Sequence, residues 1–197
     1  MESPILDYLD ALTCGDDEGA EAAVAGIAAI PAQHAQVILE RLRGLLDDPS
    51  ADTRWWATRA IAALSDPSIL PLLVRALDDQ CAAVRQCAAL SLRFHPDIRA
   101  VPALVTTLSD DDDLVARLAS DALANTGEAA VPALLEVMNS EACAARLHAV
   151  RALAKIGDHR SIPALFTALD EDSALMEYWA TEGLERMGVG MMLFSPD

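Results

Sequence analysis

The chain has 197 residues, of which 53% are hydrophobic, only 4% are aromatic and 38 are alanine, a composition typical of closely packed helices. Its formal charge of −17, from 31 acidic and 14 basic residues, argues against nucleic-acid partners, because duplex binding depends on neutralising phosphates with Lys and Arg. No apolar run approaches the ~18 residues of a membrane span, and the acidic N-terminus lacks the pattern of a signal peptide, so we expect a cytoplasmic protein without a membrane partner.

Residues 3–31 are the first expected element, a pair of helices joined by a short acidic turn. This pair is the weakest of six copies of one unit, because Gly26 and Ile30 stand where later copies have an alanine and, four positions on, an aliphatic residue. Terminal copies of a repeat are often atypical because one side faces solvent. The later copies are expected at residues 34–65, 67–95, 97–126, 128–157 and 160–188.

Two markers identify the copies. The first is an alanine in the second helix, at separations of 31, 31, 30 and 31 residues: Ala57, Ala88, Ala119, Ala149 and Ala180. The second is a proline in the first helix, where a missing N–H costs no hydrogen bond: Pro71, Pro102, Pro132 and Pro163. A repeat of this length indicates a solenoid. We therefore predict an all-α fold, a right-handed α-solenoid (α-α superhelix) of about six helix pairs, in one domain over residues 1–197 with a capping tail at 189–197.

Two motifs within the repeat resemble a known family. Residues 157–165 read GDHRSIPAL, and Val84-Arg85 is followed by Ala88 and Leu92. Both motifs resemble HEAT-like repeats, especially the short type found in phycobilin lyase subunits, and the resemblance covers residues 34–188. It implies an armadillo-like stack of helices, but the same repeat serves many unrelated functions.

The resemblance also implies a ladder of arginines at the starts of second helices, each paired with an acid in the preceding turn. The arginines in that place are Arg54, Arg85 and Arg146, with Asp48 and Asp79 six residues before the first two. In the other later copies, Ala116 and Glu177 replace the arginine, and Ser140 replaces the acid before Arg146. We therefore expect a structural ladder that is partly lost toward the C-terminus.

Acidic residues gather in the turns between first and second helices. These turns hold 16 of the 31 acids: Asp16, Asp17, Glu18, Asp47, Asp48, Asp52, Asp78, Asp79, Asp110, Asp111, Asp112, Asp113, Glu141, Asp170, Glu171 and Asp172. We interpret them as caps that complement the dipoles of the second helices. A site for a cation or a basic protein on this edge is the alternative.

The candidate binding residues lie at outward positions of the second helices. If Val84, Ala88 and Leu92 face inward, helical geometry turns Leu90 outward, and the resemblance places that side on the concave surface of the stack. Exposed aromatic and arginine residues are typical interface anchors. The candidates are Trp55, Arg59, Leu90, Arg117, Leu147, Arg151 and Tyr178. We place the neighbouring Trp56 and Trp179 in the seams between repeats.

Metal and enzyme sites find little support in the sequence. Deoxyhypusine hydroxylase, which resembles this chain in fold, binds iron through His-Glu dipeptides, and no histidine here precedes a glutamate. We interpret His148 as a hydrogen-bonded histidine of a helix seam, and the four cysteines as buried, reduced side chains, since they show no zinc-site spacing. No cofactor is expected.

The sequence thus predicts a non-enzymatic scaffold that binds a protein or peptide on its concave surface. The alternative is a bilin lyase subunit or bilin chaperone that resembles phycobilin lyase subunits, with arginines such as Arg117 and Arg151 holding propionates.

Overall fold

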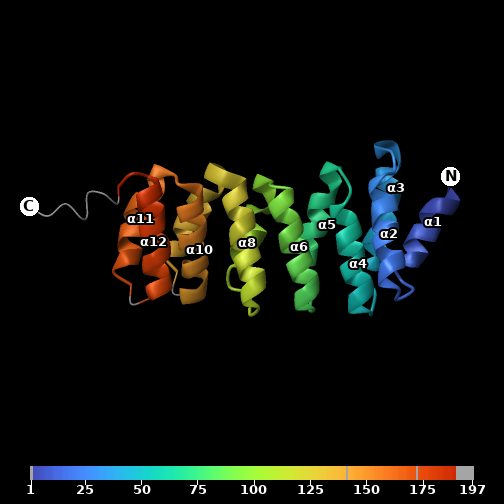
Figure 1. Ribbon diagram of the computed structural model, residues 1–197, viewed down its shortest axis with the longest axis horizontal. Helices are drawn as coiled ribbons and strands as arrows, with labels where there is room; N and C mark the ends of the chain where they lie inside the picture. Colours follow the sequence, from blue (N-terminus) through green and yellow to red (C-terminus); the bar gives the residue numbers. More distant parts are fainter. Residues whose placement is uncertain (1, 141, 172, 190–197) are drawn as a thin grey trace, which may run out of the picture. The chain divides into compact units, whose positions relative to one another are not determined.

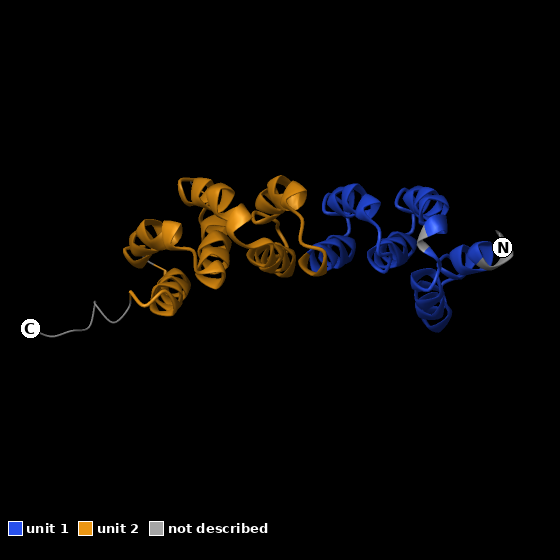
Figure 2. Cartoon of the chain, turned by 90° about the horizontal axis from the view of Figure 1, so that it is seen from above, with its two compact units in different colours: residues 1–92 blue, residues 93–197 orange. Residues whose placement is uncertain are grey.

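The computed structural model describes residues 2–140, 142–171 and 173–189. Within these ranges every regular element is a helix. The chain divides into two compact units, Met1–Leu92 and Arg93–Asp197, which Figure 2 shows in blue and orange. A single domain over residues 1–197 stays a prediction, and most of the expected capping tail, residues 190–197, lies outside the described residues.

Helix pairs make up both units, as expected from the repeat. Unit 1 contains α1 (Glu2–Ala11), α2 (Asp17–Ala28), α3 (Ala35–Leu45), α4 (Ala51–Ala62), α5 (Leu70–Ala76) and most of α6 (Ala82–Phe94). Unit 2 contains α7 (Val101–Thr107), α8 (Asp113–Thr126), α9 (Val131–Met138), α10 (Cys143–Ile156), α11 (Ile162–Leu169) and α12 (Ala174–Arg186). Within unit 2, the second helices α8, α10 and α12 form one layer, and the first helices α7, α9 and α11 form the other (Figures 1 and 2).

Local sequence signals place the helix ends. The four marker prolines lie in the first turns of α5, α7, α9 and α11, as predicted. A short 3₁₀ turn precedes each of these four helices, and an aspartate caps three of the turns, as where Asp158 accepts a hydrogen bond of 2.8 Å from the N–H of Arg160. At the end of α10, Gly157 takes a left-handed conformation with φ of 70°, which glycine adopts without strain.

The alanine markers form the core beneath the second helices. Each of the five is fully buried: Ala57, Ala88, Ala119, Ala149 and Ala180. The aliphatic residue four positions later is also buried in each copy, as with Ile61 and Leu184. An alanine has almost no side chain, so neighbouring helices approach closely at these positions.

The expectation about the cysteines is wrong in part, because Cys87 is buried but Cys14 and Cys143 are exposed.

The first copy departs from the repeat for a physical reason. A Cβ atom on Gly26 would lie only 2.4 Å from Cζ of the Tyr8 ring, so α1 packs on α2 through an aromatic ring that an alanine would displace.

Within the described residues, none of the helices combines the length and the apolar character needed to span a bilayer.

Candidate functional site

Four of the seven candidate residues lie together in unit 2. Arg117 on α8 and Tyr178 on α12 are exposed, and Leu147 on α10 is half-buried. Arg151, also on α10, has a side chain only 12% exposed. Because α10 packs against both α8 and α12, these four residues form one surface, which we call the second-helix face of unit 2.

Arg151 is engaged inside this surface. Its Nη2 donates to Oδ1 of Asp121 at 2.8 Å, and its Nη1 donates to the backbone oxygen of Arg117 at 2.9 Å. Lys155 donates to the same carboxylate oxygen at 2.5 Å. Burial by itself would raise the pKa of Asp121, but the hydrogen bonds and charges of Lys155 and Arg151 outweigh burial and hold the pKa below its usual value. Arg151 therefore ties α10 to α8, a role that its spacing in the sequence did not reveal.

The side chains of Arg151 and Lys155 also make cation–π contacts with the ring of Trp179. Cζ of Arg151 lies 5.4 Å and Nζ of Lys155 lies 5.7 Å from the centre of its ring, within cation–π range. Trp179 is half-buried, in agreement with its predicted place in a seam. The Tyr178 ring meets it edge to face at 5.1 Å, yet Tyr178 remains 57% exposed. The Tyr178 ring therefore packs against Trp179 and still stays largely exposed.

His148 lies in the same region and is buried, as expected for a seam position. The expectation that it is hydrogen-bonded is wrong for Nδ1, which has no partner among the described residues. Its Nε2 lies 3.6 Å from Oδ1 of Asp113. Burial lowers the pKa of His148, the positive charges of Arg151 and Arg117 lower it further, and Asp113 opposes them in part. At neutral pH the ring is therefore uncharged.

The other three candidates lie in unit 1. Trp55 on α4 is half-buried, with its ring edge to face against Trp56 at 4.7 Å. Arg59 is exposed and pairs with Oε1 of Glu21 on α2 at 2.8 Å. Leu90 on α6 is 40% exposed. Outward exposure is thus clear for Arg59 and Leu90, while Trp55 divides its surface between solvent and its neighbour.

The arginine ladder exists, but its acids come from a different turn than predicted. Nε and Nη2 of Arg54 donate hydrogen bonds to the two carboxylate oxygens of Asp79, 25 residues later, at 2.7 and 2.9 Å. Asp48, the predicted partner, contributes its backbone oxygen instead, at 2.9 Å from Nη1. The Arg54–Asp79 pair therefore joins one helix pair to the turn of the next pair.

Arg146 repeats this arrangement in unit 2. It forks onto Glu171 with distances of 3.0 and 2.8 Å, and its Nη1 donates to the backbone oxygen of Ser140 at 2.9 Å. The serine in place of an acid therefore does not interrupt the ladder, since any residue offers a carbonyl oxygen. The predicted loss is wrong at this copy.

The acidic turns of unit 1 enclose a cleft of about 460 Å³. Its lining residues are Leu46, Asp47, Asp48, Pro49, Arg54, Arg75, Ala76, Asp78, Asp79 and Gln80. Two of its carboxylates already have cationic partners, because Asp79 pairs with Arg54 and Asp47 pairs with Arg75. Across the described parts of the chain, no three His, Cys, Asp or Glu side chains come together in a way that could hold a metal ion. The cleft therefore mainly surrounds the Arg54–Asp79 ion pair of the ladder.

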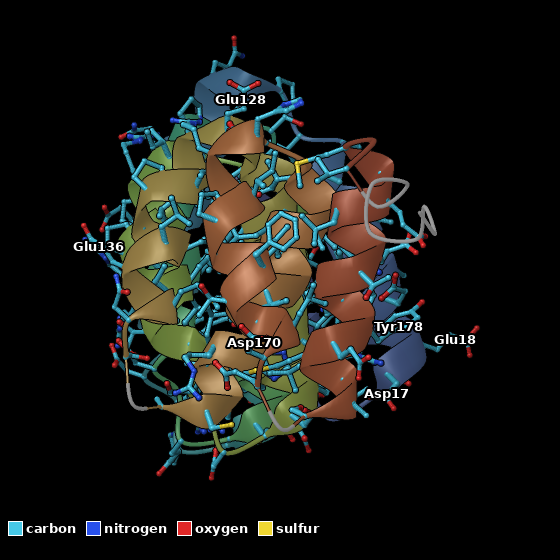
Figure 3. The ribbon with its side chains drawn as sticks, turned by 90° about the vertical axis from the view of Figure 1, so that its left-hand side faces the viewer. Asp17, Glu18, Glu128, Glu136, Asp170 and Tyr178 are labelled. Atoms are coloured by element: carbon cyan, nitrogen blue, oxygen red, sulfur yellow. The ribbon has the colours of Figure 1, made fainter. Side chains whose placement is uncertain are left out.

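A second hollow, of about 350 Å³, lies along α12 and includes residues outside the seven candidates. We call its lining the α12 face: Ala174, Glu177, Tyr178, Thr181, Glu182 and Glu185. Figure 3 shows Tyr178 on α12 and Glu136 on α9 at opposite sides of the two layers. The sequence signal for this face is the helical spacing of residues 174, 178, 181 and 185, which places them on one side of the helix.

Comparison with known proteins adds information on the family and the fold. The sequence matches the family described as HEAT repeats in three overlapping stretches, residues 7–93, 38–124 and 101–185. None of the curated protein sequences matches the chain.

Several solved structures share the arrangement of helices. An engineered protein has a TM-score of 0.53 and 24% identity, with 94% of this chain and 97% of that chain covered. A designed armadillo repeat protein in complex with the peptide (KR)4 has a TM-score of 0.53 and 22% identity, with 91% and 98% covered. The complex of CpcE and CpcF of phycocyanin lyase from Nostoc sp. PCC7120 has a TM-score of 0.52 and 19% identity, with 92% and 76% covered. These similarities and the helix pairs confirm the predicted α-solenoid class, and at such identities they establish the fold alone.

Proposed function

This chain belongs to the HEAT repeat family, and we propose that it is a non-catalytic scaffold that binds a protein or peptide segment on the outward side of its second helices. The observation that carries the proposal is the exposure of apolar groups there, with Tyr178 57% and Leu90 40% exposed. Solvent alone favours polar residues at such positions, and exposed aromatic rings are typical anchors of interfaces.

The rigidity of the second-helix face of unit 2 supports the proposal. The cluster of Asp121, Arg151, Lys155 and Trp179 joins three helices through ion pairs and cation–π contacts. A surface held in place before binding loses little conformational entropy when a partner arrives. The designed armadillo protein with a bound peptide is a precedent for a peptide ligand on a stack of this fold.

Selection from a library of random displayed peptides tests the proposal. We expect peptides with micromolar or better affinity, and we expect Tyr178→Ala to weaken them about tenfold, as at other aromatic anchors. Val37→Ala is the matched control, because Val37 is 58% exposed but lies on the first helix α3. Peptides that respond to Val37→Ala and not to Tyr178→Ala would place binding elsewhere. A selection without any enriched peptide would contradict the proposed function.

Bilin binding is the second candidate function, favoured by the phycocyanin lyase complex among similar structures and by the resemblance to the phycobilin lyase type of repeat. On the second-helix face of unit 2, Arg117 is exposed and has room to pair with a propionate, whereas Arg151 is engaged with Asp121. A tetrapyrrole held on this face would change its absorption spectrum on titration with the protein, and Arg117→Ala would weaken the change. A spectrum that stays constant at tens of micromolar protein would eliminate this candidate.

A further inference from the structure

We propose that the α12 face binds a segment of a partner protein that carries lysine or arginine side chains. This inference rests on the proposed function and specifies the chemistry of the partner. The occupant is a basic segment because the face combines carboxylates that pair with none of the described residues, an exposed aromatic ring and a hollow of side-chain size.

The carboxylates of this face have no partner in the described part of the chain. Glu177, Glu182 and Glu185 form no hydrogen bond or ion pair with any described residue, in contrast to Asp121 and Glu171, which each pair with a base. Three unpaired negative charges along two turns of a helix repel one another. A partner's cation would relieve this repulsion and gain charge-assisted hydrogen bonds.

The aromatic ring points to the same ligand. Trp179 already receives two of the protein's own cations, Arg151 and Lys155. Tyr178, the next residue, makes no cation–π contact with a base in the described part of the chain. It is 57% exposed and lines the same hollow as Glu182. A lysine or arginine seated there would contact both the ring and a carboxylate. The hollow of about 350 Å³ has room for such a side chain.

The charge of the whole chain assists encounter but does not select this face. With 31 acids and 14 bases, the protein attracts any basic peptide from a distance. A convincing test must therefore separate the contribution of this face from the general field. Glu128 and Glu136 serve this purpose, because both are exposed in unit 2, and Figure 3 shows them away from Tyr178.

The experiment measures binding of fluorescently labelled peptide (KR)4 to the full chain by anisotropy. We expect the double variant Glu182→Gln/Glu185→Gln to weaken binding about tenfold, and Tyr178→Ala to weaken it about threefold. The matched variant Glu128→Gln/Glu136→Gln removes the same charge and should weaken binding less than twofold. Equal losses in the two double variants would overturn the inference, because binding would then reflect net charge alone.

The peptide selection separates failure of this inference from failure of the proposed function. Enriched peptides that depend on Tyr178 but lack basic residues would leave the proposed function standing and overturn the inference. Absence of any bound peptide would overturn both. Self-association that sedimentation detects in the unaltered chain, and that Tyr178→Ala abolishes, would identify a second copy as the occupant and also overturn the inference.

Discussion

Single residues already show how neighbours decide the effect of a substitution, as two helical glycines illustrate. A Cβ atom on Gly26 would lie 2.4 Å from the Tyr8 ring, whereas one on Gly44 would meet nothing within 4 Å. We expect Gly26→Ala to lower the free energy of unfolding by about 1–3 kcal/mol through overpacking. Gly44→Ala should instead raise it by up to about 1 kcal/mol, because alanine favours a helix. Urea denaturation measures both, and equal effects would mean that the Tyr8 ring moves aside without cost.

His148 gives a prediction at the same scale for the dependence of stability on pH. Burial holds its pKa in the folded protein below the ordinary value of 6.5, so between these two values the unfolded chain binds a proton that the folded chain does not. Stability should therefore be unaffected by His148 above pH 6.5 and fall as the pH decreases through that value, by at most about 1.4 kcal/mol per pH unit.

The control for this effect is His148→Leu, which fills the seam without a titrating group. Unfolding measured in urea between neutral and mildly acidic pH should show a smaller loss of stability in the variant than in the unaltered protein. Identical pH profiles for the two proteins would contradict the buried, uncharged state of this ring.

Between elements, the bidentate pairs of Arg54 and Arg146 with carboxylates give the prediction with the largest expected change in stability. The side chains of Arg54 and Asp79 are only 6% and 11% exposed, so Arg54→Met would leave a largely buried carboxylate without its hydrogen-bonded arginine. We expect a loss of about 3 kcal/mol in the free energy of unfolding. Arg146→Met should cost less, because Arg146 and Glu171 are 18% and 25% exposed.

A second substitution tests whether the cost arises from the stranded charge. Asp79→Asn, added to Arg54→Met, removes the charge and keeps an oxygen that accepts from the N–H of Cys81. The double variant should recover at least half of the lost stability. A loss below about 1 kcal/mol for Arg54→Met alone would place this pair among ordinary surface ion pairs.

The ladder also shows which contacts between elements a repeat pattern can predict. The resemblance to HEAT-like repeats identified Arg54 and Arg146 correctly, but it paired Arg54 with an acid in its own copy. The fork instead reaches the next copy, and the carbonyl oxygen of Asp48 fills the expected place. Spacing along the chain describes one helix pair, whereas the partner of a long side chain depends on how two pairs stack.

For the whole molecule, the charge of −17 predicts how stability responds to salt. Repulsion among the acids opposes the compact state and is screened as ionic strength rises. Raising NaCl from about 0.01 M to about 0.5 M should therefore increase Tm, by roughly 5 °C. Scanning calorimetry measures this change. A decrease in Tm would mean that ion pairs such as Arg54–Asp79 contribute more to stability than the repulsion removes.

The helical class, the helix pairs and their core follow from the order of residues alone, because buried alanines and first-turn prolines act through local geometry that the repeat reproduces in each copy. The same order also placed Leu90 and Tyr178 on an exposed side, since position on a helix fixes direction. Which outward groups are engaged depends on how the helices pack: Arg151 is held by Asp121, whereas Glu182 and Glu185 have no partner among the described residues. These outcomes depend on contacts between side chains about 30 residues apart, which neither composition nor spacing determines.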